Sequence, residues 1–373
     1  MNRTLRPAIP LRLLILTACL SFAVLLVVAF IALPDWLPNP SAPYAPPSSA
    51  ARLLAPVAVS RDQGSHPIGW WLMDDFAHQE PTPNILVLGN SQLGGLRAAD
   101  AQVAGRNLDF VLDHRGYALE RALNGDAQSG LNRVFVASQP GPLVSDYYAM
   151  VRALITSDRK PDLVVLAVAP RDFMSNGLSY PGASQYFRFF SPLIDWQGAL
   201  PLRDLAYPSL SSRFDSSVRQ MIGPHLPACG AGKFVFLRQD KQRYKDIDID
   251  GDCHEESLAS TSVTTQLAFF EETIAWLRKA PCTVVVVSLP LLSTHQKSRS
   301  FTTELNGRIA RTCAEGKGLP GACVSFLNLS VDKRFIKEDF LDPIHLSQAG
   351  GHKFANIVSN WIKTNNLNSR MPE

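Results

Sequence analysis

Closely spaced cysteines are missing from this sequence. Its 373 residues include six cysteines, and no two of these form a CxxC pair. Such pairs are the usual mark of structural zinc sites and of thiol redox centres. The spacing of the cysteines therefore disfavours both kinds of site.

An excess of charge of one sign is missing as well. The chain has 36 basic and 33 acidic residues, a formal net charge of +3, and its basic residues form no long run. Nucleic-acid-binding surfaces need a concentrated basic patch or stripe, so we expect no nucleic-acid partner. The hydrophobic share of 46% is typical of a globular protein and confines any disorder to segments.

One long apolar run is present near the start of the chain. Residues 13–33 are 21 residues without a charge, enough to cross a hydrocarbon core of roughly 30 Å at about 1.5 Å per residue. Basic residues precede this run and none follows it until Arg52, so the positive-inside rule places residues 1–12 in the cytoplasm. We therefore expect a single-pass protein of the inner (plasma) membrane whose main body is periplasmic or otherwise extracytoplasmic.

Two other interpretations of this run stay open. A cleaved signal peptide would need a small-residue cleavage site, and the stretch FIALPDW offers a poor one. Lipidation at Cys19 would fit the box that begins at Leu16, but the apolar run continues for 14 residues beyond this cysteine.

The segment after the apolar run is rich in proline. Residues 34–60 predict an extended tether between the membrane and a domain that spans residues 61–373. In an oxidising exterior the domain could form disulfides. We expect Cys282 to be left over at the start of a strand, and two disulfides that pair Cys313 with Cys323 and Cys229 with Cys253.

Short runs of almost continuous apolar residues recur along the domain. Continuous rather than alternating hydrophobicity is typical of strands buried on both faces, as in a parallel sheet covered by helices. Between the runs, LVSDYYAMVRALI and TTQLAFFEETIAWLRKA have apolar positions at helical spacing. We therefore expect a three-layer α/β/α fold with a five-stranded, mostly parallel sheet. The predicted strands are 84–89, 133–138, 162–169, 282–289 and 323–329.

The alternation of strands and helices lapses between about residues 173 and 260. A structureless loop of that length is uncommon in a compact domain, so we expect an insertion or small subdomain there. Its aromatic residues favour packing over stacking on sugars; they are Tyr180, Tyr186, Phe187, Phe189, Phe190 and Trp196. Beyond it, the last helix of the chain is expected to begin after a capping Ser347.

One serine stands on a tight turn at the end of a buried strand. The stretch ILVLGNSQLGG places Ser91 just past the first predicted strand. In an open parallel sheet, ligands bind at the carboxyl ends of the strands, which is where Ser91 lies. Its hydroxyl could cap the following helix or act as a nucleophile, and the turn alone does not decide between them.

A carboxylate and an imidazole stand together near the end of the chain. In FLDPIHLSQAGG, Asp342 and His345 are three residues apart in a turn that leads into the last helix. A serine becomes a good nucleophile when a histidine accepts its proton, and that histidine works best when a carboxylate fixes its tautomer. Ser91, His345 and Asp342 supply these roles.

The two stretches resemble the first and last motif blocks of the SGNH, or GDSL-like, hydrolase superfamily. The resemblance implies a flavodoxin-like fold in which Ser91 is the nucleophile, His345 the base and Asp342 its partner. Asn90, beside the serine, is a further candidate contact for the oxyanion or the substrate. The matching residues are Gly89-Asn90-Ser91 and Asp342-Pro343-Ile344-His345, followed by Leu346, Ser347 and Gly350.

The inner blocks of that superfamily bear on the oxyanion hole. The family uses the serine N–H, a glycine N–H after the second strand and an asparagine in a GxND turn after the third. The stretch ASQPGPLVSD supplies Gly141, but AVAPRDF has Ala169 and Arg171 in place of the glycine and the asparagine. Either Arg171 is a cationic donor, Asn176 reaches back along the loop, or the site binds without turnover. Arg171 could also merely pair with Asp172 or another surface acid; we favour a role at the site.

At a looser level the chain is similar to accessory proteins that acylate cell-envelope polymers, in teichoic acid D-alanylation and alginate acetylation. This implies an O-acyl (acetyl) transferase or esterase that acts on an envelope polysaccharide, glycolipid or other glycoconjugate through an acyl-serine. A multi-spanning membrane O-acyltransferase is the implied partner. The alternative is a catalytically silent binding or scaffold subunit of an envelope-polysaccharide complex.

No metal or other cofactor is needed for this chemistry. The stretch DIDIDGD, residues 246–252, resembles the start of a calcium loop, but Ser257 stands where a glutamate would complete it. We favour a solvated acidic loop over a structural calcium site.

Overall fold

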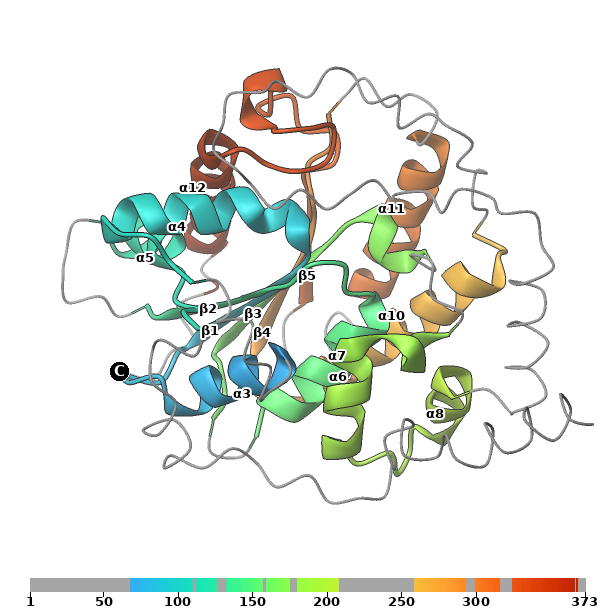
Figure 1. The fold of residues 1–373 in the computed structure, drawn as a ribbon. Helices are drawn as coiled ribbons and strands as arrows, with labels where there is room; N and C mark the ends of the chain where they lie inside the picture. Colours follow the sequence, from blue (N-terminus) through green and yellow to red (C-terminus); the bar gives the residue numbers. More distant parts are fainter. Residues whose placement is uncertain are drawn as a thin grey trace, which may run out of the picture. The chain divides into compact units, whose positions relative to one another are not determined.

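Five buried strands form one sheet in which every neighbouring pair runs parallel (Figure 1). The order across the sheet is β2-β1-β3-β4-β5, as in flavodoxin-like folds. The predicted five-stranded sheet is confirmed, and it is parallel throughout rather than mostly parallel. The strands are β1 (Ile85–Gly89), β2 (Val134–Ser138), β3 (Leu163–Val168), β4 (Thr283–Ser288) and β5 (Val324–Asn328).

Much of the N-terminal part of the chain lies outside the described residues. The predicted cytoplasmic segment 1–12, span 13–33 and tether 34–60 all fall there, as does the acidic stretch 246–252. Within the described ranges, no helix has the length and apolar character needed to cross a bilayer. The computed structural model describes residues 68–109, 112–125, 132–156, 159–174, 180–207, 258–292, 299–315, 324–365 and 367.

The strands are apolar on both faces because helices cover both. Every residue of β1, β3 and β4 is buried. Ile85 and Val87 belong to the core on one face. Phe135 of β2 points to the other face, where its ring lies edge-on to Phe76 of α3 (Ile68–His78). This two-sided burial explains the continuous hydrophobicity of the strand sequences.

One face of the sheet is covered by α4, α5 and α12, whose apolar side chains form a single core with the strands (Figure 1). The last of these helices is capped as predicted, because Ser347 Oγ accepts a hydrogen bond from Gly350 N at 3.2 Å. The helices are α4 (Gly94–Ala104), α5 (Tyr117–Asn124) and α12 (Gln348–Thr364).

The opposite face carries a second layer of helices built around α6 (Figure 1). Helix α6 packs against α7 and α10, while α11 packs beside β5. Helices therefore lie on both sides of the sheet, which is the three-layer arrangement expected from the sequence. The further helices are α6 (Val144–Leu154), α7 (Gln185–Phe190), α8 (Leu200–Ala206), α10 (Thr261–Lys279) and α11 (Arg299–Ala314).

Helices α7 and α8 belong to the segment predicted as an insertion, about residues 173–260. The aromatic residues of α7 turn inward, and Tyr186, Phe187 and Phe190 are all buried. The ring of Trp196 lies 6.0 Å from that of Phe187. Packing, the favoured role for these aromatic residues, is thus confirmed for α7.

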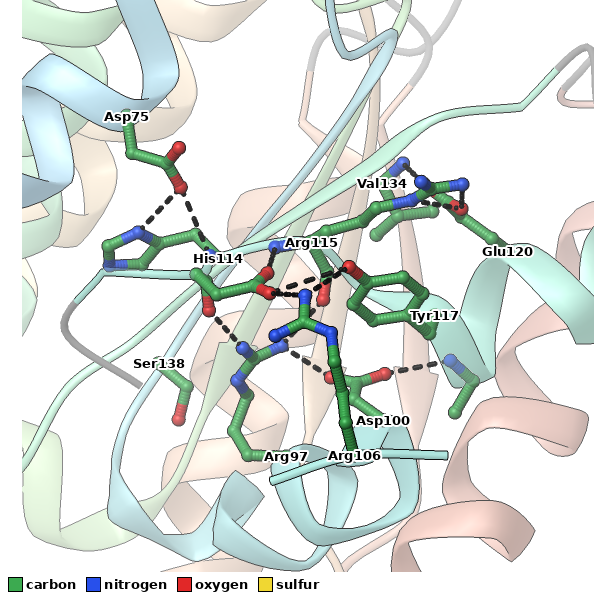
Figure 2. Close-up of polar contacts among 12 residues, drawn as sticks. Asp75, Arg97, Asp100, Arg106, His114, Arg115, Tyr117, Glu120, Val134 and Ser138 are labelled. Carbon is green, nitrogen blue, oxygen red and sulfur yellow. Dashed lines mark hydrogen bonds and ion pairs between the residues drawn. The ribbon is translucent and has the colours of Figure 1, made fainter. Parts of the chain in front are cut away.

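The outer edge of β2 is covered by the segment that precedes α5 (Figure 2). Gly116 N donates to Val134 O at 2.8 Å, and Val136 N donates to His114 O at 2.7 Å. The His114 side chain is buried, and its Nδ1 lies 2.9 Å from Asp75 Oδ2 of α3. The two backbone hydrogen bonds satisfy polar groups of β2, which is an edge strand. The contact between His114 and Asp75 connects α3 to the segment that covers this edge.

Cys282 stands immediately before β4, as predicted, and carries a buried free thiol. Burial raises the pKa of this thiol to about 12, so it stays protonated at physiological pH and is a poor nucleophile. Cys229, Cys253 and Cys323 lie outside the described residues. Both predicted disulfides therefore stay predictions.

The first turns of α4 and α12 approach each other so closely that only glycine fits between them. A Cβ on Gly95 would lie 2.2 Å from Ser347 O, and one on Gly351 would lie 2.0 Å from Gly95 O. Leu346 N also donates to Gln92 O at 3.2 Å, which joins the two loops that lead into these helices. The last glycines of ILVLGNSQLGG and FLDPIHLSQAGG thus lie at the contact between the two stretches.

Adding a methyl group at Gly351 should force α12 away from α4, because the atoms that the methyl would meet are backbone atoms. We expect Gly351→Ala to lower the free energy of unfolding by about 1–3 kcal/mol, measured by chemical denaturation. Gly307→Ala is the control, because Gly307 is also helical but has open space around it. Equal stability of the two variants would contradict a tight contact.

Candidate active site

Ser91 is the first residue of the short helix η3 (Ser91–Leu93), directly after β1. The cap of this helix is Asn90, whose Oδ1 accepts a hydrogen bond from Gln92 N at 2.8 Å. The interpretation of Ser91 as a cap is therefore wrong. In the sheet, β2 lies on one side of β1 and β3 on the other, so the order of the strands reverses beside β1. In open α/β sheets, ligands bind at the carboxyl edge of such a switch point.

The Ser91 hydroxyl contacts an imidazole from the other end of the chain. Ser91 Oγ lies 3.1 Å from His345 Nε2, and His345 Nδ1 lies 2.7 Å from Asp342 Oδ2. A carboxylate at Nδ1 keeps a proton on that nitrogen, which leaves Nε2 to accept the serine proton. The side chains of His345 and Asp342 are 25% and 31% exposed, so a substrate can approach them from solvent.

Backbone groups hold Asp342 in place. Its Oδ1 accepts hydrogen bonds from the N–H groups of Ile344 at 2.9 Å and His345 at 2.8 Å. Burial works to raise the pKa of Asp342, but the hydrogen bonds and charge of His345 outweigh it, and the pKa is lowered. Asp342 is thus ionised at neutral pH and can stabilise a protonated imidazole.

A buried network fixes the turn behind Ser91. Asn90 is 3% exposed, and its Nδ2 donates to Asp172 Oδ1 at 2.7 Å. The other oxygen of Asp172 accepts hydrogen bonds from Tyr147 OH at 3.2 Å and from Ala169 N at 3.0 Å. Both the nitrogen and the oxygen of the Asn90 side-chain amide form hydrogen bonds within the protein, so this side chain stabilises the turn.

Two fully buried carboxyl groups belong to the helices around this turn. Burial raises the pKa of Asp172, in η4 (Pro170–Phe173), to about 7. Burial likewise raises the pKa of Asp146, in the first turn of α6, to about 7, although this carboxyl accepts a hydrogen bond from Leu143 N at 2.7 Å. Both groups therefore bind protons near neutral pH in the folded protein.

Gly141 lies in the loop that follows β2, half-buried and with a φ of 71°. This left-handed conformation favours glycine, because a Cβ would be strained there. The carbonyl of the preceding Pro140 accepts a hydrogen bond from Tyr186 OH at 3.2 Å, so α7 helps to hold the loop. The role of the Gly141 N–H as an oxyanion donor stays a prediction.

Arg171 lies in η4, half-buried, within electrostatic reach of two carboxylates. Burial lowers the pKa of its guanidinium, while Asp172 and Asp342 act in the opposite direction. The structure thus places a cation near the carboxylate that supports His345. Its role as a replacement for the asparagine found in SGNH hydrolases stays a prediction, and Asn176, the other candidate, lies outside the described residues.

Sequence reasoning missed the residues that support the serine turn. Asp172 is considered there only as an ion-pair partner of Arg171, and Tyr147 only as part of an amphipathic helix. Ser138 Oγ donates a hydrogen bond to Asn90 O at 2.8 Å. A polar residue at the end of the apolar run RVFVAS is the one signal that could have drawn attention to Ser138.

The solved structures that are similar to this chain include the following two. A protein from Streptococcus pneumonia, provisionally described as a platelet activating factor, is 12% identical with a TM-score of 0.35, over 91% of this chain and 98% of that one. A carbohydrate esterase, whose active site is described as having divergent catalytic and non-catalytic binding functions, is 10% identical with a TM-score of 0.36, over 77% and 70%. No protein-family model matches the chain, and no curated protein does. The function must therefore be inferred from the residues and the geometry of the site.

The raised pKa values predict that stability falls as the pH rises. Between about pH 4 and pH 7 the folded protein keeps protons on Asp146 and Asp172 that the unfolded chain releases, so the free energy of unfolding decreases. Asp146→Asn removes one of these titrations, and its melting temperature should fall less than that of the wild type across this window.

Asp204→Asn is the matched control for this measurement, because Asp204 is exposed on α8. It should keep the wild-type dependence of melting temperature on pH. If Asp146→Asn also keeps that dependence, Asp146 does not carry a proton in the folded protein.

Proposed function

We propose that this protein is a membrane-anchored, extracytoplasmic serine acyl-transfer enzyme, an O-acyl (acetyl) transferase or esterase that acts on a cell-envelope polysaccharide or glycoconjugate. The observation that carries the chemistry is the line of contacts from Ser91 Oγ through the imidazole of His345 to Asp342. The resemblance of the flanking motifs to SGNH hydrolases supports the same reaction. The apolar run of residues 13–33 supports the anchor.

In the first half of the reaction, Ser91 Oγ attacks the carbonyl carbon of an ester. His345 Nε2 accepts the serine proton as the new C–O bond forms, and Asp342 stabilises the imidazolium. The N–H groups of Ser91 and Gly141 bind the oxyanion of the tetrahedral intermediate. Its collapse breaks the bond to the leaving alcohol, which takes the proton from His345, and leaves acyl-Ser91.

In the second half, another nucleophile resolves the acyl-serine. Water or a sugar hydroxyl gives its proton to His345 and attacks the acyl carbon, and Ser91 regains its proton as it leaves. Water yields a free acid, whereas a sugar yields an acylated polymer. The choice depends on whether the site excludes water while it binds the sugar. A multi-spanning membrane O-acyltransferase is the partner that the looser resemblance to envelope acylation proteins supports.

Ser91→Ala should abolish hydrolysis of a small acetyl ester and labelling by a serine-directed fluorophosphonate, because both reactions use Ser91 Oγ. The melting temperature should stay close to that of the wild type, since Asn90 and not Ser91 caps η3. Both assays use the full-length chain in detergent. Ser325→Ala, at a half-buried serine of β5, is the control. Unchanged hydrolysis in Ser91→Ala would remove the nucleophilic role from this residue.

Candidate polysaccharides added to the wild-type reaction, together with an activated acyl donor, separate the two activities. Acyl groups recovered on the polymer identify a transferase, and free acid alone identifies an esterase. If the folded wild-type protein gives neither product and takes no label, the alternative of a catalytically silent binding or scaffold subunit is favoured.

Arg171→Ala should lower kcat on the acetyl ester by roughly 10²-fold, the usual loss for one oxyanion donor, with little change in KM. Arg171→Lys keeps the positive charge but loses the planar guanidinium with its several N–H donors. The kcat of this variant should therefore lie between those of Arg171→Ala and the wild type. Arg203→Ala, at a half-buried arginine of α8, is the control. A kcat for Arg171→Ala equal to that of the control would exclude Arg171 from the oxyanion hole.

A further inference from the structure

Ser138 is placed by the sheet beside the turn that carries Ser91. It is the last residue of β2, and the parallel register pairs it with Gly89, the last residue of β1 (Figure 2 labels Ser138). Its side chain is half-buried, and its Oγ donates a hydrogen bond to Asn90 O at 2.8 Å. The pairing of β1 with β2 therefore holds the Ser138 hydroxyl within hydrogen-bonding distance of the backbone of the serine turn.

The carbonyl that Ser138 contacts belongs to the same peptide unit as the Ser91 N–H. In a trans peptide the C=O and N–H bonds point in opposite directions, so a bond that fixes the oxygen also fixes the direction of the N–H. Asn90 O accepts a second hydrogen bond, from Leu93 N at 3.1 Å. Because Ser91 is the first residue of η3, its own N–H is not needed within that helix.

Hydrogen bonds to the carbonyl also change the strength of the N–H as a donor. The groups in a chain of hydrogen bonds polarise one another, which strengthens each bond by about 10–30%. The two donors on Asn90 O thus make the Ser91 N–H more positive. An oxyanion carries more charge than the ester oxygen from which it forms, so this gain is larger in the transition state than in the bound substrate.

The Ser138 contact is separate from the contacts that hold the rest of the turn. Asp172 and Gln92 N bind the side chain of Asn90, and His345 contacts the hydroxyl of Ser91. Within this network the Ser138 hydroxyl contacts only Asn90 O, the carbonyl of the peptide unit that joins Asn90 to Ser91. Removing the Ser138 hydroxyl should therefore leave the cap and the three triad residues in place.

We propose that Ser138 is a positioning residue that orients and polarises the Ser91 N–H as an oxyanion donor. This inference rests on the proposed serine acyl transfer, because only that reaction places an oxyanion at this N–H. It adds to the reaction a residue outside the triad, three positions before Gly141 in the stretch ASQPGPLVSD.

The test compares Ser138→Ala with Ser138→Thr, which keeps the hydroxyl and suits a strand. The matched control is Ser359→Ala, because Ser359 Oγ also donates to a backbone carbonyl, that of Ala122, at 2.8 Å. Hydrolysis of the acetyl ester gives kcat, KM and the pH profile. Affinity for a trifluoromethyl ketone, whose adduct with a serine carries an oxyanion, reports directly on the donor.

We expect Ser138→Ala to lower kcat by about tenfold, less than the loss of a whole oxyanion donor, with KM changed by less than about twofold. Affinity for the ketone should fall by the same factor as kcat. The pH profile should keep its shape, because Ser138 touches neither His345 nor Asp342. Ser138→Thr should restore most of the rate, and Ser359→Ala should match the wild type.

Three results would overturn the role of Ser138 while the acyl-transfer function stands. Ser138→Ala could match Ser359→Ala in kcat and ketone affinity, or Ser138→Thr could be as slow as Ser138→Ala. KM and melting temperature could also change together with kcat, which would mark a merely structural role. A wild-type protein that neither hydrolyses the ester nor takes the fluorophosphonate would instead refute the proposed function, and the role of Ser138 with it.

Discussion

The backbone contact between the first turns of α4 and α12 is the constraint on which the site depends. In the sheet, β5 is three strands away from β1, about 14 Å at a spacing of about 4.8 Å. The loop after β5 must therefore return along the carboxyl edge of the sheet before His345 can reach Ser91. The bridge between Phe340 and Leu346 stiffens that loop, and the contact at Gly95 and Gly351 fixes where it ends.

The site divides into exposed groups that can react and buried groups that hold them. His345 and Asp342 are partly exposed, whereas Asn90, Asp172 and Tyr147 are almost completely buried. Buried hydrogen bonds have few competing water molecules, so they fix the turn in one arrangement. Such preorganisation is what electrostatic stabilisation of a transition state needs, because the donors need not move as charge develops.

Much of the fold could be predicted because burial on both faces leaves a direct trace in the sequence. The apolar runs located all five strands, and the cap of α12 followed from Ser347 at the start of a helical pattern. The two motif stretches could be brought to the same edge of the sheet because parallel strands share their carboxyl ends. These inferences use patterns that lie within a single segment of the chain.

The supports of the site could not be predicted, because they depend on how separate segments meet. The contact between Asn90 and Asp172 joins the ends of β1 and β3, and that of Ser138 depends on the register of β2 against β1. The serine turn by itself also left Ser91 between two roles, and the nucleophilic role was favoured only through the distant Asp342 and His345. Only the neighbouring Asn90, seen in three dimensions, shows which residue caps η3.

The contact between Ser91 and His345 joins residues that are 254 positions apart. A contact of such long range requires a long loop to close, which costs conformational entropy. A chain that emerges N-terminus first presents its serine long before α12 can dock against α4. Ser91 therefore stays without its base until almost the whole domain has been made, and the proposed chemistry becomes available only once the fold is complete.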